Sequence, residues 1–84
     1  MDLVKYMISK ILKTMRKKAK LSQKELAKMC NIANTTLSGY ESNYREPTYE
    51  TIEKIANLCN YDIIFQNRKT KEILTSKNIE RKEL

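Results

Sequence analysis

The chain has 84 residues, and its 17 lysine and arginine residues outnumber its 10 aspartate and glutamate residues, which gives a formal net charge of +7. It contains no histidine, one glycine and two cysteines, which excludes a histidine base, a glycine-rich phosphate loop and a zinc-type ligand cluster. A chain of this length forms one small domain, and its charge favours a polyanionic partner such as nucleic acid or an anionic membrane surface. We therefore expect a binding protein that is not an enzyme, with no cofactor and no metal.

The first predicted element is an amphipathic helix that runs from about Asp2 or Leu3 to Ala19. Apolar residues recur in it every three or four positions, at Val4, Ile8, Ile11, Leu12 and Met15. Lysines and an arginine crowd the stretch from Lys10 to Lys28, with Glu25 as the only acid among them. This basic stretch is either a solvated face or a surface for phosphate groups.

A capping box marks the start of the second predicted helix, because Ser22 is followed three residues later by Glu25. Apolar residues at helical spacing place this helix at about Gln23 to Cys30. Asn31 then supplies a turn, since asparagine tolerates the left-handed backbone region better than most residues do. Cys30 and Cys59 each end a predicted helix on its apolar side, so we expect both to be small core residues.

The third predicted helix spans Asn34 to Ser42 and turns Leu37 and Tyr40 toward the core. Its opposite face is small and polar and consists of Asn34, Thr35, Ser38 and Gly39. Such a face lets the helix backbone lie close to a partner surface, and the major groove of B-DNA is wide enough to admit a helix. An ordinary polar surface is the alternative interpretation.

The last part of the chain changes from helical to β-favouring patterns. Thr48 can cap a fourth helix that ends at Asn60. Two β-favouring runs separated by the polar loop QNRKTK then predict a β-hairpin, about Asp62 to Gln66 and Glu72 to Ser76, before a charged tail. An isolated hairpin is marginal in water. We therefore expect residues 61–84 to pair with a second subunit or a partner protein, or to fold onto their own domain.

The pattern from Ile8 to Asn60 resembles the lambdoid phage repressor and Cro class of helix-turn-helix proteins, the Xre family. The resemblance implies a mostly α fold, with a compact four-helix DNA-binding domain in residues 1–60 and a C-terminal β-hairpin or strand extension in residues 61–84. It also implies a structural ion pair between Arg16 and Glu41. Four residues stand where the family often has glycine, and we expect the turns to survive at each of them: Lys20, Asn31, Asn43 and Asn60.

The resemblance also implies roles at a DNA interface. The residues expected to read bases are Asn34, Thr35, Ser38 and Gly39. The residues expected to contact phosphates are Ser22, Gln23, Ser42, Asn43, Tyr44 and Arg45. Asn34 has a second possible role as the helix cap, because Ala33 stands where the family prefers a serine or threonine. Gly39 replaces a side chain that often reads DNA, and close approach to DNA is the only reason we find for it.

Three functions remain open from the sequence. The first is a sequence-specific regulator of transcription, most simply a repressor that binds a palindromic, A·T-rich double-stranded operator as a homodimer. The second is an antitoxin-type protein that binds a partner toxin through residues 61–84 and represses its own promoter. The third, a membrane-surface activity of the cationic first twenty residues, leaves the capped motif without a role. Because no long uncharged apolar run is present, we expect no membrane span, no signal peptide and a cytoplasmic location.

Overall fold

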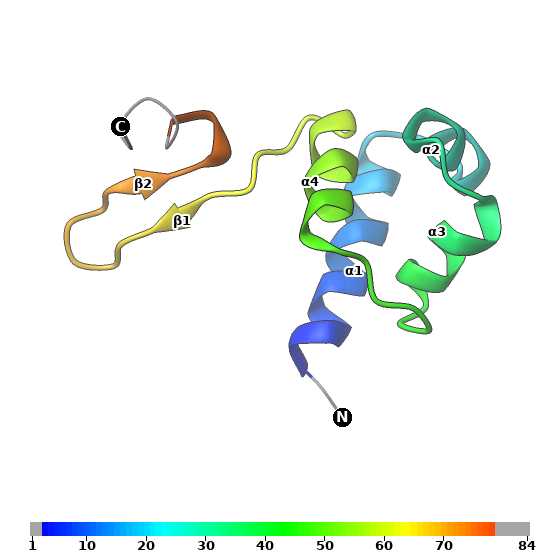
Figure 1. Ribbon diagram of the computed structural model, residues 1–84, viewed down its shortest axis with the longest axis horizontal. Coiled ribbons are helices and arrows are strands. Elements are labelled where there is room, and N and C mark those ends of the chain that lie inside the picture. The colour runs from blue at the N-terminus through cyan, green and yellow to red at the C-terminus, as the bar shows by residue number, and fades with distance from the viewer. Residues whose placement is uncertain (1–2, 79–84) are drawn as a thin grey trace.

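Helices α1 to α4 form the body of the molecule, and a short β-hairpin extends from one side of it (Figure 1). A computed structural model describes residues 3–78, with side chains from residue 7 onward. The elements are α1 (Leu3–Lys18), α2 (Gln23–Cys30), α3 (Asn34–Glu41), α4 (Tyr49–Leu58), β1 (Phe65–Gln66) and β2 (Ile73–Leu74). This mostly helical architecture with a C-terminal strand pair confirms the predicted fold class.

The helix ends follow from local chemistry. At the start of α2 the Ser22 hydroxyl accepts the Glu25 backbone N–H at 3.0 Å, and the Ser22 backbone N–H donates to the Glu25 carboxylate at 2.8 Å. At the start of α4 the Thr48 hydroxyl accepts the backbone N–H of Thr51 at 3.2 Å. The four residues that stand where the resembled family has glycine all adopt left-handed backbone angles: Lys20, Asn31, Asn43 and Asn60, with φ between 60° and 69°.

The core lies between the four helices, and each of them contributes one large, fully buried aliphatic side chain. These side chains are Leu12, Leu26, Leu37 and Ile55. Burying a side chain of this size stabilises a fold by roughly 1.5–3 kcal/mol. Cys30 and Cys59 are free thiols in the same core, and burial raises the pKa of both. Because Leu37 is the side chain that anchors α3, the opposite face of α3 is left outside the core.

Several predicted boundaries were wrong. The third helix ends at Glu41, with Ser42 as its C-cap, and the first helix ends at Lys18. The observed strands are much shorter than the predicted ones, because only Phe65 with Leu74 and Gln66 with Ile73 are paired. The apolar side chains around this pairing are exposed, so no packing surface among the described residues holds a longer ladder together. The expected start at Asp2 and the tail beyond residue 78 lie outside the described residues.

The hairpin returns to the helical body through its last residues. The Ser76 hydroxyl hydrogen bonds to the carboxylate of Glu53 on α4. Residues 76–78 are helical, and the Lys77 ammonium donates to the Asp62 carboxylate at 2.8 Å. In the part of the chain that the structure describes, no helix is long and apolar enough to span a bilayer.

Candidate nucleic-acid interface

The α2 and α3 helices form a compact helix-turn-helix unit. Asn31 ends α2 in the left-handed region, and Ile32 donates its backbone N–H to the Ala27 carbonyl at 3.0 Å. Lys54 of α4 donates to the carbonyl of Cys30 at 3.0 Å, which places a cation at the C-terminal end of α2, where the helix dipole favours one. The turn and its tie to α4 therefore fix the direction in which α3 starts.

The outward face of α3 gathers three of the four residues expected to read bases. Asn34 and Thr35 are exposed and Ser38 is half-buried. Helical geometry places Thr35 opposite Leu37 and Ser38 beside it, while Asn34 is exposed as the first residue of the helix. This is the small polar surface that the sequence indicated. Its members carry no charge, so any charge at this face has to come from neighbouring segments.

Asn34 does not cap the helix. The N-cap position belongs to Ala33, whose backbone is extended, and α3 has no side-chain hydrogen bond at its cap. Asn34 is the first helical residue, and it is exposed. Of the two roles left open by the sequence, the cap is the one that the structure contradicts.

Gly39 differs from the other three, because it is buried. An ideal Cβ built on Gly39 would lie 3.0 Å from both Cγ and Cδ of Arg45 and 3.4 Å from its Cβ. The alkyl part of the Arg45 side chain thus fills the space where a side chain at position 39 would be. Contrary to the expectation from sequence, Gly39 offers no open surface for the close approach of DNA.

The Arg16 and Glu41 side chains are brought together, and they form the most buried polar cluster near the interface. The Arg16 Nε donates to Glu41 Oε2 at 2.7 Å, and the side chains are only 10% and 2% exposed. Gln23 was expected to contact phosphate, but its Nε2 donates to Glu41 Oε1 at 3.0 Å. Gln23 therefore joins α2 to the end of α3, a role that its sequence position did not reveal.

The loop after α3 holds the remaining residues expected at phosphates. Tyr44 is 85% exposed, and Arg45 is exposed as well. The Ser42 hydroxyl donates to the Gly39 carbonyl at 3.3 Å, and Asn43 turns the chain with a φ of 64°. The Ser22 hydroxyl is engaged in the α2 cap. Tyr44 and Arg45 are therefore exposed members of this group whose side chains make no hydrogen bond within residues 7–78.

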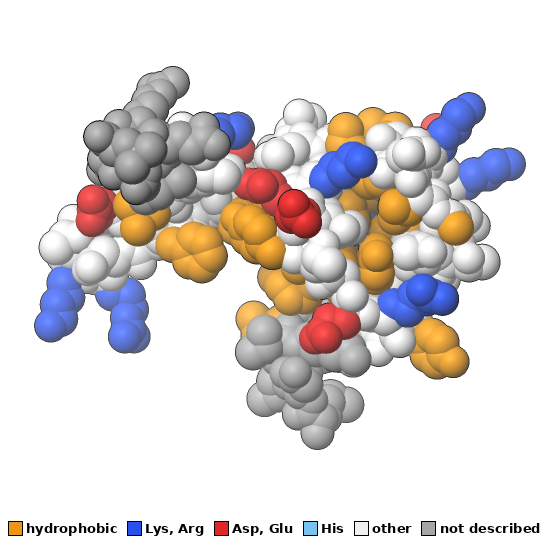
Figure 2. Space-filling model, viewed as in Figure 1, with side chains coloured by type: hydrophobic (Ala, Val, Ile, Leu, Met, Phe, Trp, Pro, Cys, Tyr) orange, Lys and Arg blue, Asp and Glu red, His pale blue; other side chains and the backbone are white. Residues whose placement is uncertain are grey.

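Charge is unevenly spread over the surface. On the face shown in Figure 2, basic side chains project at the helical side and at the tip of the hairpin, while acidic side chains lie mainly between them. Lys24 and Lys28 on α2 are exposed beside the helix-turn-helix unit. Within residues 7–78 no group of histidine, cysteine or acidic side chains is placed to hold a metal ion.

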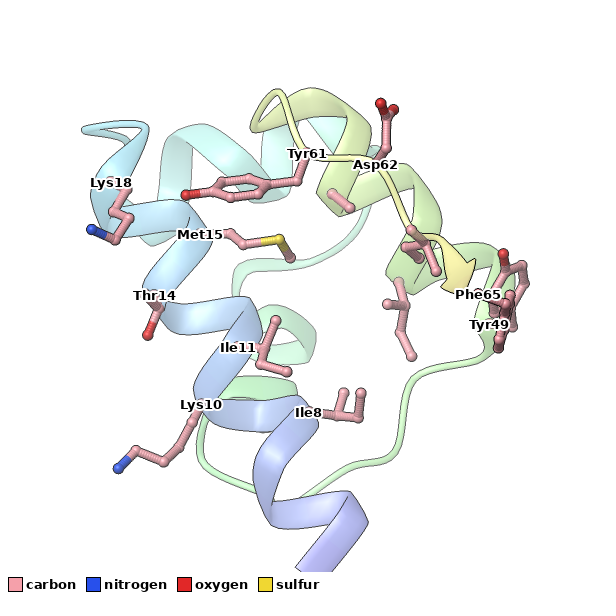
Figure 3. A pocket seen from close by; sticks show the side chains of 13 residues that line it. Ile8, Lys10, Ile11, Thr14, Met15, Lys18, Tyr49, Tyr61, Asp62 and Phe65 are labelled. Atoms are coloured by element: carbon pink, nitrogen blue, oxygen red, sulfur yellow. The ribbon is translucent and has the colours of Figure 1, made fainter. Parts of the chain in front are cut away.

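The sequence did not predict an open apolar groove of about 700 Å³ (Figure 3). It is lined by apolar side chains of α1 and α4 and by the segment that leads into β1, among them Ile11, Met15, Tyr49 and Phe65. No residue of α2 or α3 lines this groove. It is therefore a second surface, separate from the exposed face of α3.

Comparison with known proteins identifies relatives of this unit. A family described as helix-turn-helix matches residues 12–66. The chain is 47% identical over 53 residues to the HTH-type transcriptional regulator ImmR of Bacillus subtilis (strain 168). That match covers 63% of this chain and 42% of ImmR, so the chain spans less than half the length of this relative.

Proposed function

Because the chain belongs to the helix-turn-helix family of the Xre/Cro type, we propose that it is a sequence-specific regulator of transcription that binds double-stranded DNA through α3. The observation that carries the proposal is the exposed, small and polar face of α3, which Leu37 anchors from the opposite side. In its simplest form the protein is a repressor that blocks a promoter by occupying an operator. Such a regulator acts where the DNA is, so we propose that the protein is located in the cytoplasm.

In the proposed complex the N-terminal half of α3 enters the major groove. The Asn34 amide can give adenine one donor and one acceptor, and the methyl group of Thr35 can meet that of thymine. Ser38 can hydrogen bond with several bases and discriminates less. The half-site that these side chains favour is rich in A·T pairs.

Phosphate contacts would set the register of the helix in the groove. Tyr44, in the loop after α3, and the lysines at positions 24 and 28 of α2 are exposed. The Gln23 amide donates one hydrogen to Glu41, which leaves its second hydrogen for a phosphate. Contacts of this kind orient a protein on DNA without reading its sequence.

We also propose that the DNA-bound form is a homodimer joined through the hairpin and the groove beside it. Two paired residues per strand are too few for a stable isolated hairpin, and Ile64, Phe65, Ile73 and Leu74 are all more than a third exposed. A second copy would cover these side chains and pair with an open strand edge. Two α3 helices about 34 Å apart would then match successive major grooves and a palindromic operator.

The test is a selection of binding sites from random duplex DNA, followed by affinity measurements on the selected site at several salt concentrations. We expect enrichment of an A·T-rich site with two-fold symmetry and a linear fall of log affinity with log salt concentration. The absence of any enriched site, or an affinity that is independent of salt, would contradict the proposed function. Light scattering of the free and bound protein tests the dimer separately, and a monomer in both states would contradict it.

An antitoxin-type function is the second candidate, and the open apolar groove is the observation that favours it. In this case a segment of a partner protein, not a second copy, would cover the exposed side chains of the hairpin. A monomeric free protein that binds DNA weakly, and becomes a tight DNA binder only with its partner toxin, would favour this candidate over the first.

A further inference from the structure

Gly39 is buried although it faces outward. Helical periodicity places residue 39 on the same side of α3 as Thr35, four positions earlier, and away from Leu37. Thr35 is exposed whereas Gly39 is buried, so something outside the helix covers position 39. The covering group is the Arg45 side chain, whose Cβ, Cγ and Cδ lie where a residue-39 side chain would stand.

The loop after α3 holds Arg45 in this position. Asn43 reverses the chain with a φ of 64°. The backbone N–H groups of Tyr44 and Arg45 then both donate to the Gly39 carbonyl, at 2.8 Å and 3.0 Å. Gly39 itself has no positive φ, so the backbone of α3 would accept other residues there. What calls for glycine is the space that the Arg45 stem occupies.

The guanidinium group of Arg45 is available to bind a partner molecule. Arg45 is exposed, and within residues 7–78 its guanidinium has no hydrogen bond or ion pair. Packing of the stem on Gly39 limits the conformations of the side chain, which lowers the entropy lost when the guanidinium binds. A guanidinium fork fits the O6 and N7 atoms of guanine in the major groove. No side chain on the outward face of α3 itself carries this fork.

We propose that Arg45, held across Gly39, reads a guanine at one base pair of each half-site, in place of a side chain at position 39. This inference rests on the proposed function, and it changes the role expected for Arg45 from a phosphate contact to a base contact. It also gives Gly39 a purpose, because the glycine makes room for an arginine that comes from the loop. The half-site is then rich in A·T pairs with one G·C pair under the C-terminal half of α3.

The experiment is a selection from random duplex DNA with the full chain and three variants. Wild type should enrich one G·C position, and Arg45→Ala should lower the preference there by about fivefold or more while preserving the other positions. Gly39→Leu keeps the arginine but fills the space of its stem, so it should lose the same preference at the same position. Arg68→Ala removes an exposed arginine from the hairpin loop and serves as the control for charge, with an unchanged preference.

Melting curves check that each variant is folded. We expect Gly39→Leu to fold, because leucine is a better helix former than glycine. A uniform loss of affinity by Arg45→Ala, with a salt slope smaller by about one, would identify a phosphate contact and overturn the inference while the proposed function stands. A wild-type preference in Gly39→Leu would also overturn it. If wild type enriches no site at all, the proposed function fails, and the inference fails with it.

Discussion

Arg16 and Glu41 join the first helix to the end of the third through two parallel hydrogen bonds, from Nε to Oε2 at 2.7 Å and from Nη2 to Oε1 at 3.0 Å. The third nitrogen of the guanidinium donates to the Leu21 carbonyl at 2.8 Å, and Gln23 donates to the same carboxylate. Three segments thus meet at one buried carboxylate. This carboxylate fixes the end of α3, from which the loop carrying Tyr44 and Arg45 departs.

We predict that Glu41→Ala lowers the free energy of unfolding by about 3 kcal/mol or more, because it leaves the Arg16 charge buried without a partner. Urea denaturation measures the effect. The control is Asp62→Ala, which breaks a pair with Lys77 whose side chains are 60% and 69% exposed, and which should unfold close to wild type. Equal midpoints for Glu41→Ala and wild type would show that the buried pair does not stabilise the fold.

A double variant separates charge burial from the shape of the site. Replacing both partners, Arg16→Met with Glu41→Leu, removes the uncompensated charge and keeps apolar volume. We expect it to recover much of the stability that Glu41→Ala loses. A double variant no more stable than Glu41→Ala would mean that the uncompensated charge does not account for the loss, and that hydrogen bonds such as the one from Gln23 to Glu41 do.

The second prediction concerns the uncapped start of α3. Ala33 has the extended backbone of an N-cap but no side chain to accept a hydrogen bond, so Ala33→Ser should raise the free energy of unfolding by about 1 kcal/mol. Thermal and urea denaturation measure the gain. Thr48→Ala is the matched loss at the start of α4 and should lower stability by about the same amount. An unchanged Ala33→Ser would contradict the assignment of the cap.

Local chemistry explains how much of the fold was predictable. The capping box of Ser22 and Glu25 needs only a spacing of three residues, and Asn31 needs only its own tolerance of left-handed angles. The helical spacing of apolar residues likewise predicted which side chains form the core. The strand lengths were not predictable, because β-favouring residues form a ladder only where something covers one face, and the hairpin has little cover.

The interface was less predictable than the fold. Its exposed residues on α3 follow from helical periodicity, and Arg16 and Glu41 were paired by the family resemblance. The bond from Gln23 to Glu41 and the packing of Arg45 on Gly39 join residues of different segments. Contacts of this kind depend on where the helices and the loop lie in space, so a pattern along the chain does not contain them.

The third prediction is a pH dependence from the α2 cap. Hydrogen bonds from the backbone and then the side chain of Ser22 hold the pKa of Glu25 below its ordinary value of 4.5. A lowered pKa in the folded state means that the charge of Glu25 contributes stability above pH 4.5, and that this contribution is lost as the pH falls through the lower, folded value.

Glu25→Gln tests this, because glutamine can still take part in a capping box but carries no charge. We expect wild type to be more stable than Glu25→Gln at pH 7 and the two to converge once the pH is below the folded pKa of Glu25. Urea denaturation at a series of pH values gives the difference. If the difference in free energy of unfolding between wild type and Glu25→Gln does not change with pH, the charge of Glu25 does not contribute to stability.

The last prediction concerns Asn34, the first residue of α3 and a proposed reader of adenine. Because Ala33 holds the cap position and α3 has no side-chain cap bond, Asn34→Ala should leave the melting temperature close to that of wild type. It should relax the preference at one A·T pair by about 1 to 3 kcal/mol and leave non-specific binding and its salt slope unchanged. Asn57→Ala, on the exposed side of α4, is the matched control and should keep every base preference. Site selection and melting curves for both variants decide the matter, and an unchanged base preference in Asn34→Ala would refute direct readout by this residue.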